Sequence, residues 1–163
     1  MAAVVFSADT DDSGLGLDGT VRNNAWKQAM ATAINAAIGD WTAVTFNAGN
    51  FTASTGSWTL ASGDVLVNRY QIINKTLIWN FAAQTTTVSA TPLSLRIAIP
   101  SGTFFTTVNY NPVAFLSDNG TVRQGHLTPI DGTHLGVFIS AGSNFAAATD
   151  ATSVFFTASF GLS

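Results

Sequence analysis

Two histidines and one aspartate are the side chains whose types and spacing come closest to a metal site. His126 and His134 are the only histidines of the chain, and they flank the turn that contains Asp131. If the flanking segments form a hairpin, the histidines approach each other, and with Asp131 they supply ligands of the kind that zinc prefers. Polar residues at the rim of a fold produce the same pattern, and we favour that interpretation. We therefore expect no metal and no cofactor.

Acid–base catalysis has few candidate groups in this sequence. The nine acidic residues are all aspartates, and the chain contains no glutamate and no cysteine. Asp64, Asp118 and Asp131 stand in turn sequences, where an aspartate side chain hydrogen-bonds to nearby backbone. Glycoside hydrolysis needs two carboxylates at a fixed separation, and no nucleophile elbow, phosphate loop or dinucleotide motif occurs. We expect that the protein is not an enzyme.

Two short groups are the candidates for binding a ligand. Sugar sites commonly present an exposed aromatic ring beside amide and carboxylate side chains. Asn109, Tyr110 and Asn111 form one group of these types, and Asp118 and Asn119 form the other. Strand packing and turn formation explain both groups more simply, so the two interpretations stay open.

The N-terminal part of the chain predicts a helix that follows a flexible arm. Residues 1–20 are acidic and rich in glycine, which is typical of an arm, and residues 21–39 show helical periodicity ending at Gly39. Apolar residues recur at every fourth position, with alanines on the adjoining row: Trp26, Met30, Ile34 and Ile38, with Ala29 and Ala33. Small alanines let another helix approach closely, so this stripe is our candidate assembly surface. Packing of the helix on its own domain is the alternative.

Residues 40–163 alternate between strand and turn patterns. The candidate strands are Trp41–Phe46, Ser57–Leu60, Asp64–Ile73, Thr76–Ala83, Thr85–Ala90, Ser94–Ile99, Val108–Leu116, Thr121–Thr128, His134–Ser140 and Ser153–Phe160. The pair Asn119-Gly120 predicts a type I′ hairpin turn. Short strands at this spacing predict an all-β fold, an antiparallel jelly-roll-type β-sandwich preceded by one amphipathic α-helix.

The alternation also predicts which side chains form the core. Large aromatic residues on strand patterns are expected inside: Trp41, Trp58, Trp79, Phe81 and Phe138. Leu77 shares a face with Trp79 and Phe81, and the odd positions 93–99 are expected to point inward. Adjacent strand residues point to opposite faces, so burial of one residue of Phe155-Phe156 tends to expose the other.

The balance of charge excludes some partners and favours others. Charged residues make up 9% of the chain and the net charge is -3, whereas about a quarter of residues are charged in a usual soluble protein. Six scattered Lys and Arg residues form no basic patch for nucleic acid or an anionic membrane, and no apolar stretch approaches the ~20 residues of a membrane span. A surface with so little charge favours burial against other subunits.

Two stretches resemble short virion proteins of tailed bacteriophages. Residues 18–29, DGTVRNNAWKQA, are similar to the N-terminal helix of phage tail-fibre and appendage proteins. Residues 50–65, NFTASTGSWTLASGDV, together with TLIWNF and TVSATPLSLRIAIP further on, resemble the terminal jelly-roll domains of such proteins and, more loosely, C1q-like trimeric jelly rolls. The resemblance carries over no catalytic residue.

The resemblance implies a function, a place and a set of partners. It implies a homotrimer in the virion, with the helix at the attachment end, in contact with other virion proteins, and the sandwich displayed outward. A chain of 163 residues is too short for a fibre shaft, which favours a capsid decoration protein, a head spike or a tail-tip knob. The alternative is a receptor- or carbohydrate-binding module that recognises host surface glycans.

Overall fold

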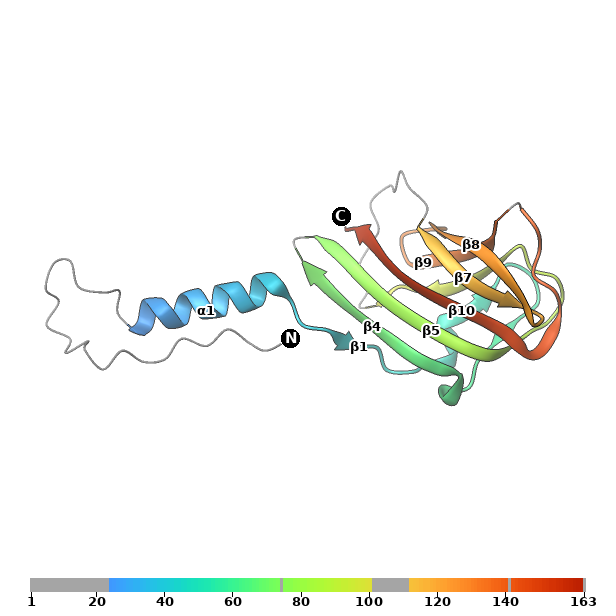
Figure 1. Ribbon diagram of the computed structural model, residues 1–163, viewed down its shortest axis with the longest axis horizontal. Helices are drawn as coiled ribbons and strands as arrows, with labels where there is room; N and C mark the ends of the chain where they lie inside the picture. The colour runs from blue at the N-terminus through green and yellow to red at the C-terminus, as the bar shows by residue number, and fades with distance from the viewer. Residues whose placement is uncertain (1–23, 74, 101–111, 141, 163) are drawn as a thin grey trace, which may run out of the picture. The chain divides into compact units, whose positions relative to one another are not determined.

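A computed structural model describes residues 24–73, 75–100, 112–140 and 142–162 of the chain. The chain divides into two units, Met1–Asp40 and Trp41–Ser163. The first unit contributes one helix to the described residues, α1 (Asn24–Ile38), and the second contains all the described strands (Figure 1).

Helix α1 ends where the sequence predicts. Gly39 has a φ of 68°, a left-handed conformation that glycine adopts at low cost, and its N–H donates to the Asn35 carbonyl at 3.2 Å. The predicted start of the helix, at residues 21–23, and the predicted arm, residues 1–20, lie outside the described residues. Among the residues that are described, no helix is long and apolar enough to cross a membrane.

The second unit is one curled antiparallel sheet. Its strands are β1 (Thr42–Ala43), β2 (Phe51–Ala53), β3 (Trp58–Thr59), β4 (Val65–Ile73), β5 (Thr76–Val88), β6 (Ser94–Ala98), β7 (Val113–Asp118), β8 (Thr121–Pro129), β9 (His134–Ile139) and β10 (Ala148–Gly161). They pair in the order β1-β4-β5-β10-β7-β8-β9-β6-β2, while β3 pairs with β5. Figure 1 shows β4, β5 and β10 running side by side.

The sheet curls so that β2, at one end of the strand order, faces β3 and β5 across the core. Phe51 on β2 lies with its ring centroid 5.5 Å from that of Trp58 on β3 and 5.9 Å from that of Phe81 on β5. The core therefore lies inside the curl, between strands from opposite ends of the sheet. This confirms the predicted all-β antiparallel sandwich with a preceding helix, whereas the jelly-roll order of its connections stays a prediction.

The long strand β5 supplies much of the core, as its alternation predicts. Leu77, Trp79 and Phe81 share the inner face and are at most 1% exposed. A buried tryptophan needs an acceptor for its indole N–H, and both buried tryptophans have one. Trp79 Nε1 donates to Asn68 Oδ1 at 2.9 Å, and Trp58 Nε1 donates to Thr86 Oγ1 at 2.8 Å.

The predicted break in this region, between Thr76–Ala83 and Thr85–Ala90, is wrong because β5 continues through a bulge. The register with β10 shifts between the pairs Thr152↔Thr86 and Val154↔Ala83, and Thr85 has a φ of 53°. The extra residue moves the inner face from odd to even positions, so that Ala83, Thr86 and Val88 are all buried. When the alternation is followed along one strand alone, the change from odd to even inner positions looks like the end of the strand.

Four core predictions are also wrong, each for a local reason. Phe138 is half-buried on the outer side of β9, since its neighbours Val137 and Ile139 fill the inner positions. Trp41 is 39% exposed, because it precedes the two-residue edge strand β1, and its ring lies 4.8 Å from the Arg69 guanidinium carbon. Leu93 is 49% exposed, whereas Ser94, predicted to point outward, is 2% exposed. The backbone N–H groups of Leu93 and Ser94 both donate to the Ser54 hydroxyl, so regular alternation begins only after them.

The hairpin between β7 and β8 confirms the predicted turn. Asn119 and Gly120 are the only residues between the two strands, and their φ angles are 48° and 75°. Positive φ at both central positions is the requirement of a type I′ turn. This tight turn fixes the register of β7 and β8, which pair from Asp118↔Thr121 to Val113↔His126.

Candidate functional site

The outer face of β7 and β8 carries the most exposed large apolar side chains of the described residues. Val122 is 65% exposed, Val113 is 61% exposed and Phe115 is 58% exposed. Their neighbours on β7, Ala114 and Leu116, are completely buried on the inner face. Because strand residues alternate between faces, the apolar residues of β7 are divided equally between the core and the surface.

Strand register extends this surface onto the strands on either side. Phe115 pairs with Phe155 of β10, and Val113 pairs with His126 of β8. The His126 ring in turn stacks on Phe138 of β9, with centroids 5.2 Å apart and planes 9° apart. We name this surface the apolar face and define it by six residues: Val113, Phe115, Val122, His126, Phe138 and Phe155.

Burial of Phe156 confirms that Phe155 belongs to the outer side. Phe156 is 6% exposed and Val154 is completely buried, so Phe155 between them points outward. The prediction for this adjacent pair therefore holds.

None of the six residues of the apolar face is Lys, Arg or Asp, and the exposed charged residues of these four strands are Arg123 on β8 and Asp150 on β10. Besides the six defining residues, the outward positions of the regularly alternating stretches are occupied by Ser117, Gln124, Thr128, His134, Gly136, Ser153, Thr157 and Ser159. Lys, Arg and Asp are absent from this set. Protein interfaces show the same depletion of charge at their centres, with aromatic residues enriched.

The outer face of β4 and β5 differs, since polar groups cross it. Arg69 pairs with Asn80, and Asn80 pairs with Thr157, which places the three on one row. The Asn80 side-chain amide donates to the Thr157 hydroxyl at 2.6 Å. Arg69 also covers the ring of Trp41, so this exposed aromatic residue lies against a charged partner, whereas Leu66 and Ile72 are exposed apolar residues on β4.

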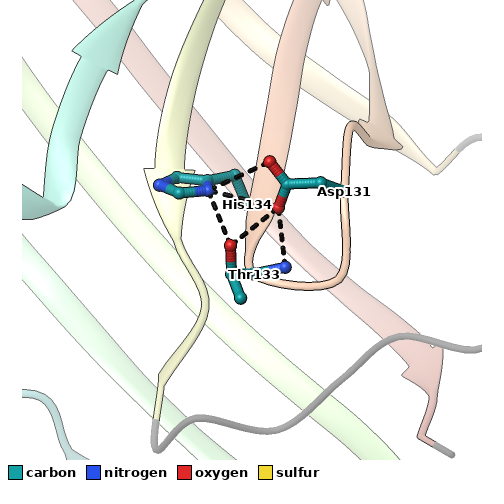
Figure 2. A network of polar contacts seen from close by, with 3 residues as sticks. All are labelled: Asp131, Thr133 and His134. Carbon is teal, nitrogen blue, oxygen red and sulfur yellow. Dashed lines mark hydrogen bonds and ion pairs between the residues drawn. The ribbon is translucent and has the colours of Figure 1, made fainter.

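The turn between β8 and β9 contains the one pronounced electrostatic feature of the described residues. Asp131 Oδ1 accepts hydrogen bonds from the Thr133 backbone N–H at 2.7 Å and from the Thr133 hydroxyl at 2.8 Å (Figure 2). His134 Nδ1 lies 2.9 Å from the Thr133 hydroxyl oxygen and 3.2 and 3.3 Å from the carboxylate oxygens. The Thr133 hydrogen bonds, and to a smaller extent His134, lower the pKa of Asp131 from 3.8 to about 2.

This network closes the turn and does not form the metal site considered from the sequence. His126 pairs with Phe138, whereas His134 begins β9 at the other end of the hairpin. Four positions along a strand correspond to about 13 Å, so the expected approach of His126 to His134 is wrong. Across the described ranges of the chain, no three His, Cys, Asp or Glu side chains gather as metal ligands.

The predicted ligand-binding residues fall into two situations. Asn109, Tyr110 and Asn111 lie outside the described residues. Asp118 is 5% exposed, and its Oδ1 accepts a hydrogen bond from the Ala146 backbone N–H at 2.9 Å. That carboxylate is engaged inside the domain, where it anchors the chain before β10. Asn119, next to it, is exposed in the turn.

The predicted assembly stripe of α1 presents several exposed side chains. Met30 is 38% exposed, Ala29 and Ala33 are exposed, and Ile34 is half-buried. The side chains of Trp26 and Ile38 lie outside the described set.

The sequence contains one pattern that points to the apolar face, although periodicity alone does not show which residues form this surface. Val113–Leu116 is an uninterrupted apolar run, so strand geometry exposes two of its four residues whichever face is inside. Recognising a surface from that run requires the neighbours of β7. The pairing with β10 brings Phe155 from about 40 residues further along the chain, and no local pattern predicts it.

Comparison with known proteins adds no relative from which a function could be transferred. No protein-family model matches the chain, and no curated protein or solved structure matches it. What the protein does must be inferred from its own residues and their geometry.

Proposed function

We propose that the chain is a structural virion protein of a tailed bacteriophage that assembles as a homotrimer. The observation that carries self-assembly is the apolar face, a surface with exposed aromatic and aliphatic side chains and no Lys, Arg or Asp among its six residues. Exposed apolar patches of this kind mark interaction surfaces in soluble proteins. The phage assignment is supported by the resemblance of residues 18–29 and 50–100 to phage appendage proteins.

The division of the chain into two units supports separate attachment and display. Helix α1 lies in the unit Met1–Asp40, while the β domain closes its own core within Trp41–Ser163. A protein that decorates a capsid, forms a head spike or ends a tail needs one part that binds the particle and one that faces outward. In this proposal α1 and the residues before it contact other virion proteins, and the β domain is displayed.

The virion assignment is tested on the particle itself. Antibodies raised against the purified β domain should label intact phage particles in negative-stain electron microscopy, at repeated and symmetry-related positions. Mass spectrometry of gradient-purified particles should find peptides of the chain at a fixed ratio to the major capsid protein. Particles that lack the chain after purification would refute the assignment.

The role of α1 in assembly is tested by charge placed on its stripe. Ala33→Glu brings like charges together if the stripes of neighbouring copies meet, because burial of an unpaired ion is costly. Light scattering should then show dissociation, while the melting temperature of the β domain stays close to that of the wild type. Thr32→Glu is the matched control, since Thr32 is also exposed and lies about 200° around the helix from Met30.

Recognition of a host surface glycan is the second candidate function. Trp41, exposed beside the Arg69 guanidinium, offers the aromatic ring and a polar group of the kinds that sugar sites use. Binding of the purified protein to a glycan array, lost in Trp41→Ala and largely kept in Trp41→Phe, would support it. An array on which wild type and Trp41→Ala behave alike would remove this candidate.

A further inference from the structure

We propose that the apolar face is the surface through which the β domains of neighbouring copies pack on one another. The inference rests on the proposed self-assembly and names the part of the β domain that carries it. Phe115 stands at the centre, because it pairs with Phe155 on one side and with Gln124 on the other. Val113 and Val122 flank it on β7 and β8.

The lack of charged residues on the face favours another copy of the chain as its partner. A charged partner surface would lose the hydration of its ions against this face and find no opposite charge in return. An uncharged partner surface avoids that loss, and every copy of the chain carries one. The apolar faces of neighbouring copies also meet with little like-charge repulsion, although each chain has a net charge of -3, because none of the six defining residues is Lys, Arg or Asp.

The short strands at the edges of the sheet are less suited to association than the apolar face. The end strands β1 and β2 have two and three residues, so neither offers a long backbone edge to another chain, although β1 pairs with only two residues of the nine-residue β4. Short edge strands are a common device that prevents pairing between sheets. Copies of the domain are therefore expected to meet through side chains on a face and not through a continued hydrogen-bond ladder.

The size of the face sets how strong that contact is. Four strands about 4.8 Å apart, over six residues at about 3.3 Å each, give a flat area on the order of 300–400 Å². A standard stable interface buries about 800 Å² on each partner. The apolar face thus provides about half of what a stable contact needs, and in this proposal α1 supplies the remainder. Loss of either region should weaken the assembly without changing the fold.

A double substitution on the face tests the proposal in the full-length protein. Phe115→Ser with Val122→Ser replaces two exposed side chains and leaves the core untouched. The control is Leu66→Ser with Leu93→Ser, since these residues are 52% and 49% exposed and lie off the face. Light scattering over a concentration series should place the dissociation midpoint of the face variant at least tenfold above that of the wild type. The control should match the wild type, and circular dichroism should show the same β spectrum for all three.

A single thiol reports directly whether the face is covered. The chain contains no cysteine, so Val122→Cys and Leu66→Cys each introduce one reactive group at a position that is exposed in the single chain. At concentrations where the protein is assembled, a maleimide should label Val122→Cys at least tenfold more slowly than Leu66→Cys. Dilution below the dissociation midpoint should bring the two rates together.

The outcomes separate this inference from the proposed self-assembly. A wild-type protein that is monomeric at tens of micromolar contradicts both. A wild-type oligomer that Ala33→Glu dissociates, but that keeps its mass in the face variant and labels quickly at Val122→Cys, contradicts the inference alone. In that case the copies associate through α1, and the apolar face stays uncovered.

Discussion

The two faces of strand β7 hold similar side chains in opposite environments. Ala114 and Leu116 are completely buried, while Val113 and Phe115, one position away, are 61% and 58% exposed. Hydrophobicity alone does not distinguish these four residues. Their position relative to the curl of the sheet decides which pair becomes core, so the exposed pair needs an explanation beyond folding.

A second contrast lies between the two halves of the outer surface. On β4 and β5 the outward groups include Arg69 and Asn80, and the exposed Trp41 lies against a guanidinium. On β7 and β8 the exposed Phe115 and Val122 lie among outward residues that include Ser117 and Gln124, and the exposed charge on β8 is Arg123. The six residues of the apolar face thus include no Lys, Arg or Asp, which is typical of the centre of a contact surface.

The largest effect expected from this comparison concerns the adjacent pair Leu116 and Phe115. Leu116→Ala leaves a cavity inside the curl and should lower the free energy of unfolding by about 2–5 kcal/mol. Phe115→Ala removes an exposed side chain and should change it by about 0.5 kcal/mol or less in the dissociated protein. Urea titrations followed by tryptophan fluorescence, at concentrations below the dissociation midpoint, measure both. Equal losses would show that Phe115 is part of the core.

We expect an intermediate effect on stability when two glycines on opposite faces of the β8–β9 hairpin are replaced by alanine. A Cβ on Gly125 would lie 2.5 Å from Leu116 Cδ1 and 2.5 Å from the Phe138 carbonyl oxygen, which is backbone and cannot rotate away. A Cβ on Gly136 would meet the side chains of Phe138 and Ile130 at 2.7 and 2.8 Å, and Ile130 is 37% exposed and able to move.

Gly125→Ala should therefore cost about 1–3 kcal/mol of stability, and Gly136→Ala should cost less. Thermal or urea unfolding of the two variants side by side gives the comparison, with Gly63→Ala as a control because no atom lies within 4 Å of its added Cβ. A larger loss at Gly136 would mean that the outer side of β9 is packed as tightly as the inner side.

The smallest expected effect concerns pH and the turn at the end of this hairpin. The pKa of Asp131 is lowered from 3.8 to about 2 by the Thr133 hydrogen bonds, so the ionised carboxylate stabilises the folded state. That contribution is fully present above about pH 4 and is lost as the pH falls towards 2. The Asp131 side chain is 52% exposed, so solvent screening keeps it small.

Melting temperatures between pH 5 and pH 2 measure this contribution. The wild type should lose slightly more stability over this range than Asp131→Asn, which keeps an acceptor for the Thr133 N–H but does not titrate. Identical pH profiles would show that the turn does not depend on the charge.

Sequence patterns predicted the strands and turns of this fold better than they predicted which strands pair with one another. The alternation of Leu77, Trp79 and Phe81 and the Asn119-Gly120 turn depend on local geometry, and both are confirmed. The break predicted within β5 is wrong because a bulge changes parity in a way that only the partner strand reveals. Likewise, the separation of His126 from His134 depends on ladder register.

The candidate site was harder to predict for the same reason. The apolar face combines residues of β7, β8, β9 and β10, and it exists only because long-range pairing places Phe155 beside Phe115. The predicted assembly stripe on α1 depended on helical spacing alone, which is a local property, and its exposed members Met30 and Ala33 are found on the helix as expected.

The shortness of β1 has a mechanical consequence for a protein held by its N-terminal end. Tension applied through α1 reaches the β domain first at β1, which two ladder pairs and the Val44–Asn68 hydrogen bond attach to β4. Strand β2 lies further along the chain, and its Phe51 is packed between Trp58 and Phe81. A pull should therefore peel β1 at low force, release up to about 10 Å of chain between Ala43 and Phe46, and stop at that aromatic cluster, because the Phe46 ring stacks on Phe51. The connection acts as a short extensible tether, which absorbs a sudden load before the core of the domain is strained.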